Sequence, residues 1–207
     1  MSVAAFFADA PVIRLADPLA GFLGASADGV LEYSYLDAVK LAGHSCPTVA
    51  GAYLATVRAL QHLYPQQLPQ RGGIAVSFSA AQDEGVTGVM AAVVGLLTGA
   101  AAEGGFKGIA GRFVRRDLLR FGVAQPQVLR FVRLDNGAGV DVAINLQRVP
   151  AAPELRELLA EALDEDATPA QRRVFAELWQ LRVRQILIER AEDPLLIELL
   201  PVLDAGS

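Results

Sequence analysis

The sequence has very little cysteine, with Cys46 alone among its 207 residues. One cysteine excludes an intrachain disulfide framework and is typical of a reducing compartment. The N-terminal stretch from Met1 to Phe22 lacks the cationic start and the unbroken apolar run of a secretory signal. We therefore expect a cytoplasmic protein.

Long apolar runs and a basic excess are also missing. The longest uncharged run, Gly85 to Ala102, contains four glycines and two threonines, and it is shorter than the roughly 20 residues of a membrane-spanning helix. It predicts a buried helix with its flanks and no membrane contact. The net charge of -5 gives no reason to expect a nucleic acid partner.

Apolar residues make up 53% and charged residues 20% of the chain, which is typical of a well-packed globular protein. Charge is unevenly distributed. Between Gly105 and Leu134 there are seven cations and a single acid, Asp117. From Ala151 onward there are twelve acids and six arginines. Either basic strands face acidic helices within the fold or across a dimer, or a small anionic molecule covers the arginine-bearing segment. The residues proposed to bind such an anion are Lys107, Arg112, Arg115 and Arg116.

Helix signals dominate the first half of the sequence. Ser34 and Asp37 form a capping-box pattern that predicts a helix through Ala42, ended by Gly43. Pro47 suits the first position of a second helix, which would run to about Leu63 with Cys46 as its N-cap. That helix would bury Val49, Tyr53, Val57 and Leu60 on one face. A strand is expected over 73–79 and a helix of small residues over 86–99.

The second half alternates between strand and helix signals. Strands are expected over 112–119, 128–134 and 140–147, the last two joined by the Asp-Asn-Gly turn at 135–137. Helices are expected over 154–163, from the Thr168 capping box to about Arg190, and over 194–203. The long helix would have an apolar stripe formed by Val174, Phe175, Leu178, Leu181 and Ile186.

This order of elements predicts an α+β fold with a mixed β-sheet flanked by helices. We expect a metal-binding domain over residues 1–150, with a helical lead-in at its N-terminus. Residues 151–207 would form a helical extension that packs on this domain or on a dimer partner.

The segment His44-Ser45-Cys46-Pro47 has the strongest chemical signal. Imidazole and thiolate two residues apart suit zinc, copper and iron remain chemical alternatives, and a helix N-terminus favours the thiolate form. Asp83 and Glu84 are the best source of further ligands, since they lie between a core strand and a helix, whereas His62 lies about four turns from Cys46. A capping cysteine without metal, and a cysteine nucleophile with a histidine base, remain alternatives.

Gly43–Pro47, followed by Gly51–Tyr53, resembles the Gly-His-x-Cys-Pro…Gly-Tyr signature of the FmdE-like family, which is named after a component of formylmethanofuran dehydrogenase. Weaker similarities follow in the same order, at Thr98-Gly99, the loop 104–108, Phe121-Gly122, 167–169 and 185–187. The resemblance implies an α+β domain, commonly dimeric, in which His44 and Cys46 bind zinc. Many members of that family have a histidine at the position of Ala42. Many also have a cysteine in the segment that corresponds to residues 83–86, which read Asp-Glu-Gly-Val in this chain.

These observations give three hypotheses of function. The first is a zinc-binding homodimer that acts as an accessory, carrier or sensor in one-carbon or metallocofactor metabolism. The second is a metal-dependent enzyme that acts on a small anionic substrate held by the arginines. The third is a haem or other large-cofactor protein with His44 or Cys46 as an axial ligand.

Overall fold

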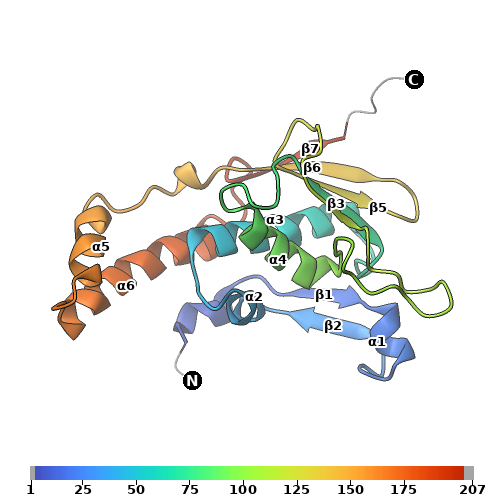
Figure 1. Ribbon diagram of the computed structural model, residues 1–207, viewed down its shortest axis with the longest axis horizontal. Coiled ribbons are helices and arrows are strands. Elements are labelled where there is room, and N and C mark those ends of the chain that lie inside the picture. Colours follow the sequence, from blue (N-terminus) through green and yellow to red (C-terminus); the bar gives the residue numbers. More distant parts are fainter. Residues whose placement is uncertain (1–2, 203–207) are drawn as a thin grey trace.

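The computed structural model describes residues 3–202 and has an α+β fold (Figure 1). The predicted fold class is therefore confirmed. The strands are β1 (Ile13–Ala16), β2 (Val30–Tyr33), β3 (Ile74–Phe78), β4 (Leu119–Arg120), β5 (Leu129–Arg133), β6 (Gly139–Ile144) and β7 (Ile197–Pro201). The helices are α1 (Pro18–Phe22), α2 (Tyr35–Ala42), α3 (Pro47–Leu63), α4 (Thr87–Thr98), α5 (Leu155–Leu163) and α6 (Pro169–Arg184).

The main sheet is mixed and has five strands in the order β4-β3-β5-β6-β7. Only β3 and β4 pair in parallel, and the other neighbours are antiparallel. The Asp-Asn-Gly turn joins β5 to β6 as predicted, with Gly137 at φ +74° and the Asn136 side chain accepting from Ala138 N–H. This turn fixes the register of the hairpin that forms the middle of the sheet.

Helices α3 and α4 form a layer between this sheet and the β1-β2 ribbon (Figure 1). The predicted face of α3 is correct, because Val49, Tyr53, Val57 and Leu60 are all buried. The hydroxyl of Tyr53 donates to the carbonyls of Pro11 and Tyr33. These hydrogen bonds satisfy a buried phenol and connect α3 to the N-terminal segment.

The N-terminal segment is less helical than expected. A short 3-10 helix, Ala5–Asp9, precedes an antiparallel ribbon in which Ile13 pairs with Tyr33 and Ala16 with Val30. Helix α2 begins at the Ser34–Asp37 capping box and ends at Gly43, which adopts φ +74°. The expected helix was therefore correct, while the ribbon before it was not predicted.

Two predicted elements in the second half are wrong. Residues 112–119 form a loop in which Phe113 and Asp117 have φ +62°, and only Leu119–Arg120 pairs as β4. Positive φ angles interrupt an extended chain, so this segment does not form a strand. Residues 194–203 were expected to be helical, but Ile197–Pro201 pairs with β6 as the edge strand β7.

Helices α5 and α6 form a hairpin that projects from the body of the molecule (Figure 1). Their predicted starts are correct, including the Thr168–Gln171 capping box, although the last turn of the long helix is a π-helix over Gln185–Glu189. Of the predicted stripe only Ile186 is buried, and Val174 and Leu181 are 43% and 44% exposed. Within residues 3–202, no helix has the length and apolar character needed to cross a bilayer.

Candidate functional site

The turn between α2 and α3 places His44 on the surface. Gly43 ends α2 in the left-handed conformation, and the exposed His44 ring follows it. The Nδ1 atom of His44 lies 2.9 Å from the carbonyl oxygen of Ala42. If Nδ1 carries the proton, it donates to this carbonyl and leaves the Nε2 lone pair available to a ligand.

Cys46 is the N-cap of α3, as its sequence position predicts. Pro47 occupies the first helical position, and the sulfur of Cys46 accepts a hydrogen bond from Val49 N–H at 3.4 Å. The residue is buried, with 8% of its surface exposed. Its thiol therefore has a structural role in starting α3, whatever else it binds.

Helix α6 forms hydrogen bonds with Ser45 of the turn between α2 and α3. The carbonyl oxygen of Ser45 accepts from Trp179 Nε1 at 2.9 Å and from Gln180 Nε2 at 3.1 Å. The hydroxyl of Ser45 donates to Gln180 Oε1 and also bonds the Tyr35 hydroxyl. No local sequence signal predicts these contacts, because Ser45 and Gln180 are 135 positions apart.

Asp83 and Glu84 lie exposed in the joint between β3 and α4. The carboxylate of Glu84 accepts from the nearby Ala81 N–H. Across residues 3–202, no three side chains of His, Cys, Asp or Glu come together in a way that could hold a metal ion. A tetrahedral zinc site needs at least three protein ligands, so the side chains present do not fit a complete site, and zinc binding by His44 and Cys46 stays a prediction.

A largely apolar cavity of about 440 Å³ opens where the first turns of α3 and α4 approach the sheet. We call it the α3–α4 cavity. Thr48 and Ala52 contribute from α3, Val86 and Met90 from α4, and Val128, Ile144 and Leu146 from the sheet side. A helix N-terminus carries partial positive charge, so two helix starts on one wall favour an anionic group inside.

Arg182 of α6 is the charged residue of this wall, which also contains the polar side chains of Thr48, Asn145 and Gln147. Its Nε donates to the Val149 carbonyl at 2.7 Å and its Nη2 to the Leu146 carbonyl at 3.1 Å. Burial lowers the pKa of its guanidinium. Among the described residues no carboxylate lies within salt-bridge distance of Arg182, so a partly buried cation borders an apolar space without an ionic partner.

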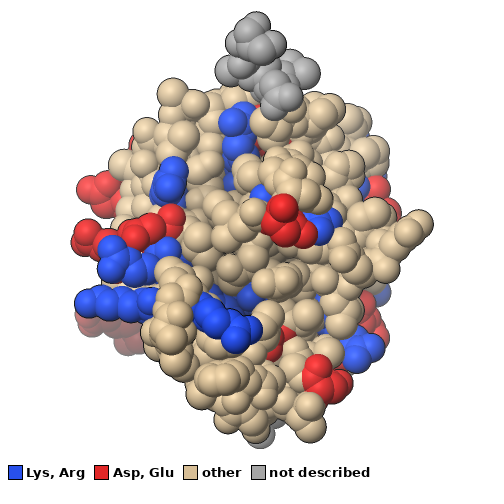
Figure 2. Space-filling model, turned by 90° about the vertical axis from the view of Figure 1, so that its right-hand side faces the viewer, with Lys and Arg blue, Asp and Glu red and all other residues tan. Residues whose placement is uncertain are grey.

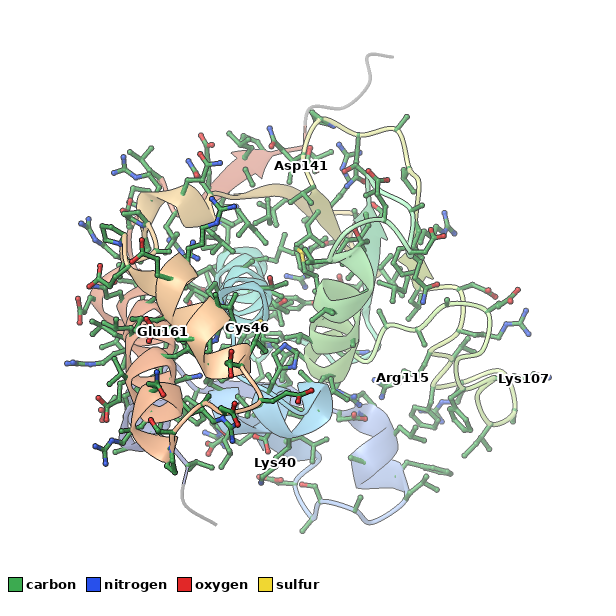
Figure 3. The ribbon with its side chains drawn as sticks, turned by 60° about the vertical axis from the view of Figure 1, so that its left-hand side comes forward. Lys40, Cys46, Lys107, Arg115, Asp141 and Glu161 are labelled. Atoms are coloured by element: carbon green, nitrogen blue, oxygen red, sulfur yellow. The ribbon has the colours of Figure 1, made fainter. Side chains whose placement is uncertain are left out.

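The four predicted anion-binding residues do not form one site. Arg115 is buried against Asp17, and Arg116 bonds Asp117 on the surface. The exposed side chain of Lys107 points outward from the loop and away from the Arg115 side chain (Figure 3), although the carbonyl of the neighbouring Phe106 accepts from Arg115 N–H. Arg112 stacks over Phe113 and lines a cavity together with Arg115.

Within residues 3–202, the basic segment forms no ion pair with the acidic C-terminal helices. The ion-pair partners of its arginines are Asp17, Asp117, Asp135 and Asp141, and all four precede residue 151. Arg130 and Asp141, for example, form a bidentate pair across β5 and β6, with distances of 2.6 and 2.8 Å. The arginines of the basic segment therefore form ion pairs within the sheet and the segments next to it.

Comparison with protein-family models gives no match to this chain, and none of the curated proteins is significantly similar to it. The resemblance to the FmdE-like family thus depends on the motif residues themselves. The structure adds that the motif forms a helix start next to a cavity.

Proposed function

We propose that the protein binds a small, largely apolar carboxylic acid in the α3–α4 cavity, with the carboxylate facing Arg182. Arg182 carries this proposal, because it is a partly buried cation that has no carboxylate partner among residues 3–202 and lines a largely apolar cavity. Ligand sites commonly combine apolar walls with a few polar groups that orient the ligand.

The hydrogen bonds of Arg182 would orient the ligand. The Val149 and Leu146 carbonyls hold Nε and Nη2, so the plane of the guanidinium is fixed before any ligand arrives. Nη1 makes no hydrogen bond to a described residue and can donate to a carboxylate oxygen. The apolar part of the ligand would pack against Ala52, Met90 and Ile144.

Octanoate and its uncharged analogue octanol provide a direct test by isothermal titration calorimetry. A charge-assisted hydrogen bond contributes about 1.5–3 kcal/mol, so octanoate should bind at least about tenfold more tightly than octanol. Arg182→Gln should remove this preference, whereas Arg182→Lys should keep part of it. Arg172→Gln, at an exposed position of the same helix, is the matched control.

Equal affinities for octanoate and octanol in the wild-type protein would contradict the proposal. So would a preference for octanoate that survives in Arg182→Gln. If neither ligand binds, the cavity has no affinity for apolar acids of this size and the proposal fails.

A second function, metal binding, is favoured by the geometry of the His44 ring. Its contact with the Ala42 carbonyl is the kind of hydrogen bond that directs Nε2 toward a metal. We propose zinc as the metal that His44 and Cys46 would bind, with at least one further protein ligand coming from a second chain and a bound small molecule or water at the remaining position. The accessory role remains a hypothesis that depends on the resemblance to the FmdE-like family, whereas the enzymatic and haem-binding roles remain hypotheses that depend on His44, Cys46 and the basic residues.

A further inference from the structure

Asp17 is the centre of a buried charge cluster that includes Arg71 and Arg115. Arg115 lies apart from Cys46, beyond α4 (Figure 3). It is 2% exposed and caps α1, with one carboxylate oxygen accepting from Leu19 N–H and Ala20 N–H. The same oxygen accepts from Arg115 Nη2 at 2.7 Å, and the other accepts from Arg71 Nη1 at 3.0 Å. Two guanidinium groups therefore share one carboxylate.

Arg115 is held in place by two glycines. Gly72 and Gly99 have φ angles of +79° and +73°, and the Arg115 guanidinium occupies the space that a Cβ atom of either would need. The side chain is 8% exposed, and its Nη1 is buried without a hydrogen-bond acceptor in the part of the chain described. An unsatisfied guanidinium N–H inside a protein is unfavourable, so this arrangement favours an additional anionic partner.

The cluster borders an open cavity of about 490 Å³. We call it the Arg115 cavity. Its wall includes Arg71, Arg112 and Arg115 together with Gly72 and Gly111, and none of its lining residues is a carboxylate. Figure 2 looks onto this end of the molecule and shows basic side chains at mid-height, some of them set back between uncharged neighbours.

The charges around this cavity do not balance. Arg71, Arg112 and Arg115 carry three positive charges, and Asp17 carries one negative charge, which leaves an excess of two. Asp135 follows the wall residue Leu134, but its two oxygens are bonded to Arg133. A phosphate monoester carries a charge of about -1.5 to -2 at neutral pH, close to the excess.

We propose that the Arg115 cavity binds a phosphate group, either free or as the monoester of a small molecule. Arg112 would contact the phosphate from the exposed side, and Arg115 would contribute from the buried side. Asp17 would hold the guanidinium groups of Arg71 and Arg115 in position. This site uses different residues from the α3–α4 cavity, so either proposal can fail without the other.

Isothermal titration calorimetry of the full chain with inorganic phosphate and with ribose 5-phosphate, at constant ionic strength, tests the proposal. Saturable binding of one or both supports it, and tighter binding of the ester would show that the cavity also contacts the sugar. Arg112→Gln should weaken binding about tenfold, the loss expected for one charge-assisted hydrogen bond.

Arg120→Gln is the matched control, since Arg120 is an exposed cation of the same basic segment outside the cavity wall. It should change the affinity less than about twofold. Arg115→Met should abolish binding in protein that circular dichroism shows to be folded. Absence of saturable binding, or equal losses in Arg112→Gln and Arg120→Gln, would overturn the proposal.

Discussion

The indole Nε1 of Trp179 donates a hydrogen bond of 2.9 Å to the carbonyl oxygen of Ser45. This bond connects α6 to the turn that starts α3, across 134 positions of sequence. It also fixes the helix that carries Arg182, because Trp179 and Arg182 lie on consecutive turns of α6. The geometry of the turn and the position of the cavity wall are therefore coupled.

Trp179→Phe should lower the free energy of unfolding by about 1 kcal/mol, the contribution of one hydrogen bond, since Gln180 still bonds the Ser45 carbonyl. Urea denaturation followed by circular dichroism measures this change, because the substitution removes the only tryptophan fluorophore. Val174→Ala, at an exposed position of α6, should change stability by less than about 0.5 kcal/mol. Equal effects of the two substitutions would show that the Trp179 hydrogen bond contributes nothing.

Asp17→Asn should be strongly destabilising at neutral pH. It leaves the guanidinium groups of Arg71 and Arg115 without their carboxylate, and breaking such a buried pair costs about 3–5 kcal/mol. Asp166→Asn, at an exposed position, should have little effect. Urea midpoints of the three proteins provide the comparison, and a loss below about 1 kcal/mol for Asp17→Asn would contradict a buried ionic cluster.

The loss of stability caused by Asp17→Asn should also depend on pH. Burial opposes ionisation of Asp17, but the Ala20 N–H and the two arginines outweigh burial and hold its pKa below the ordinary value. The stabilisation by ionised Asp17 is therefore complete above the unfolded-state pKa of about 3.9 and is lost as the pH falls through the lower folded-state pKa. The stability difference between wild type and Asp17→Asn should shrink below about pH 4, and a constant difference would exclude Asp17 as its source.

Local signals predicted much of the fold. The Ser34–Asp37 and Thr168–Gln171 capping boxes both form, and the turn at 135–137 joins two strands as expected. Each of these signals acts within four residues, so the chemistry of the segment decides the structure. The position of Cys46 as N-cap belongs to the same group.

The failed predictions depend on partners that are remote in the sequence. Segment 197–201 becomes a strand because the free edge of β6 pairs with it, and Ile197 lies opposite Ile144. The loop 112–119 instead folds back, with Phe106 O accepting from the N–H groups of Arg115 and Arg116. Tertiary pairing overrides local preference in both segments.

The residues that line the two cavities were harder to predict from the sequence than the helix and turn signals. Arg115 was predicted to bind an anion, but its pairing with Asp17, 98 positions away, was not. Arg182 was not singled out, because an arginine on an amphipathic helix is usually solvated. Only the packed structure shows that its guanidinium lies between carbonyl groups and an apolar space.

Gly72→Ala should disturb the Arg115 cavity. A Cβ atom at Gly72 would lie 2.6 Å from Cζ of Arg115, so the guanidinium must move. Gly24→Ala has nearly the same φ angle, +73° against +79°, but meets no atom within 4 Å. In both variants an alanine in the left-handed conformation lowers the free energy of unfolding by roughly 1 kcal/mol. In Gly72→Ala the overlap between the new Cβ atom and the Arg115 guanidinium should lower it by about 1–3 kcal/mol more. Equal unfolding midpoints for the two variants would mean that Arg115 moves aside freely.

Zinc binding by His44 and Cys46 predicts that gently purified protein holds about one zinc ion per chain by elemental analysis. A chelator should then lower the melting temperature of the wild-type protein, because a metal bound to the folded state stabilises it. His44→Ala should remove both the zinc and the effect of the chelator, and it should otherwise preserve the fold, since this side chain is exposed and bonds only the Ala42 carbonyl. His62→Ala is the control, because His62 is also exposed and lies near the far end of α3. A chelator effect that persists in His44→Ala would place the metal elsewhere, and wild-type protein without zinc would leave Cys46 as the N-cap of α3 alone.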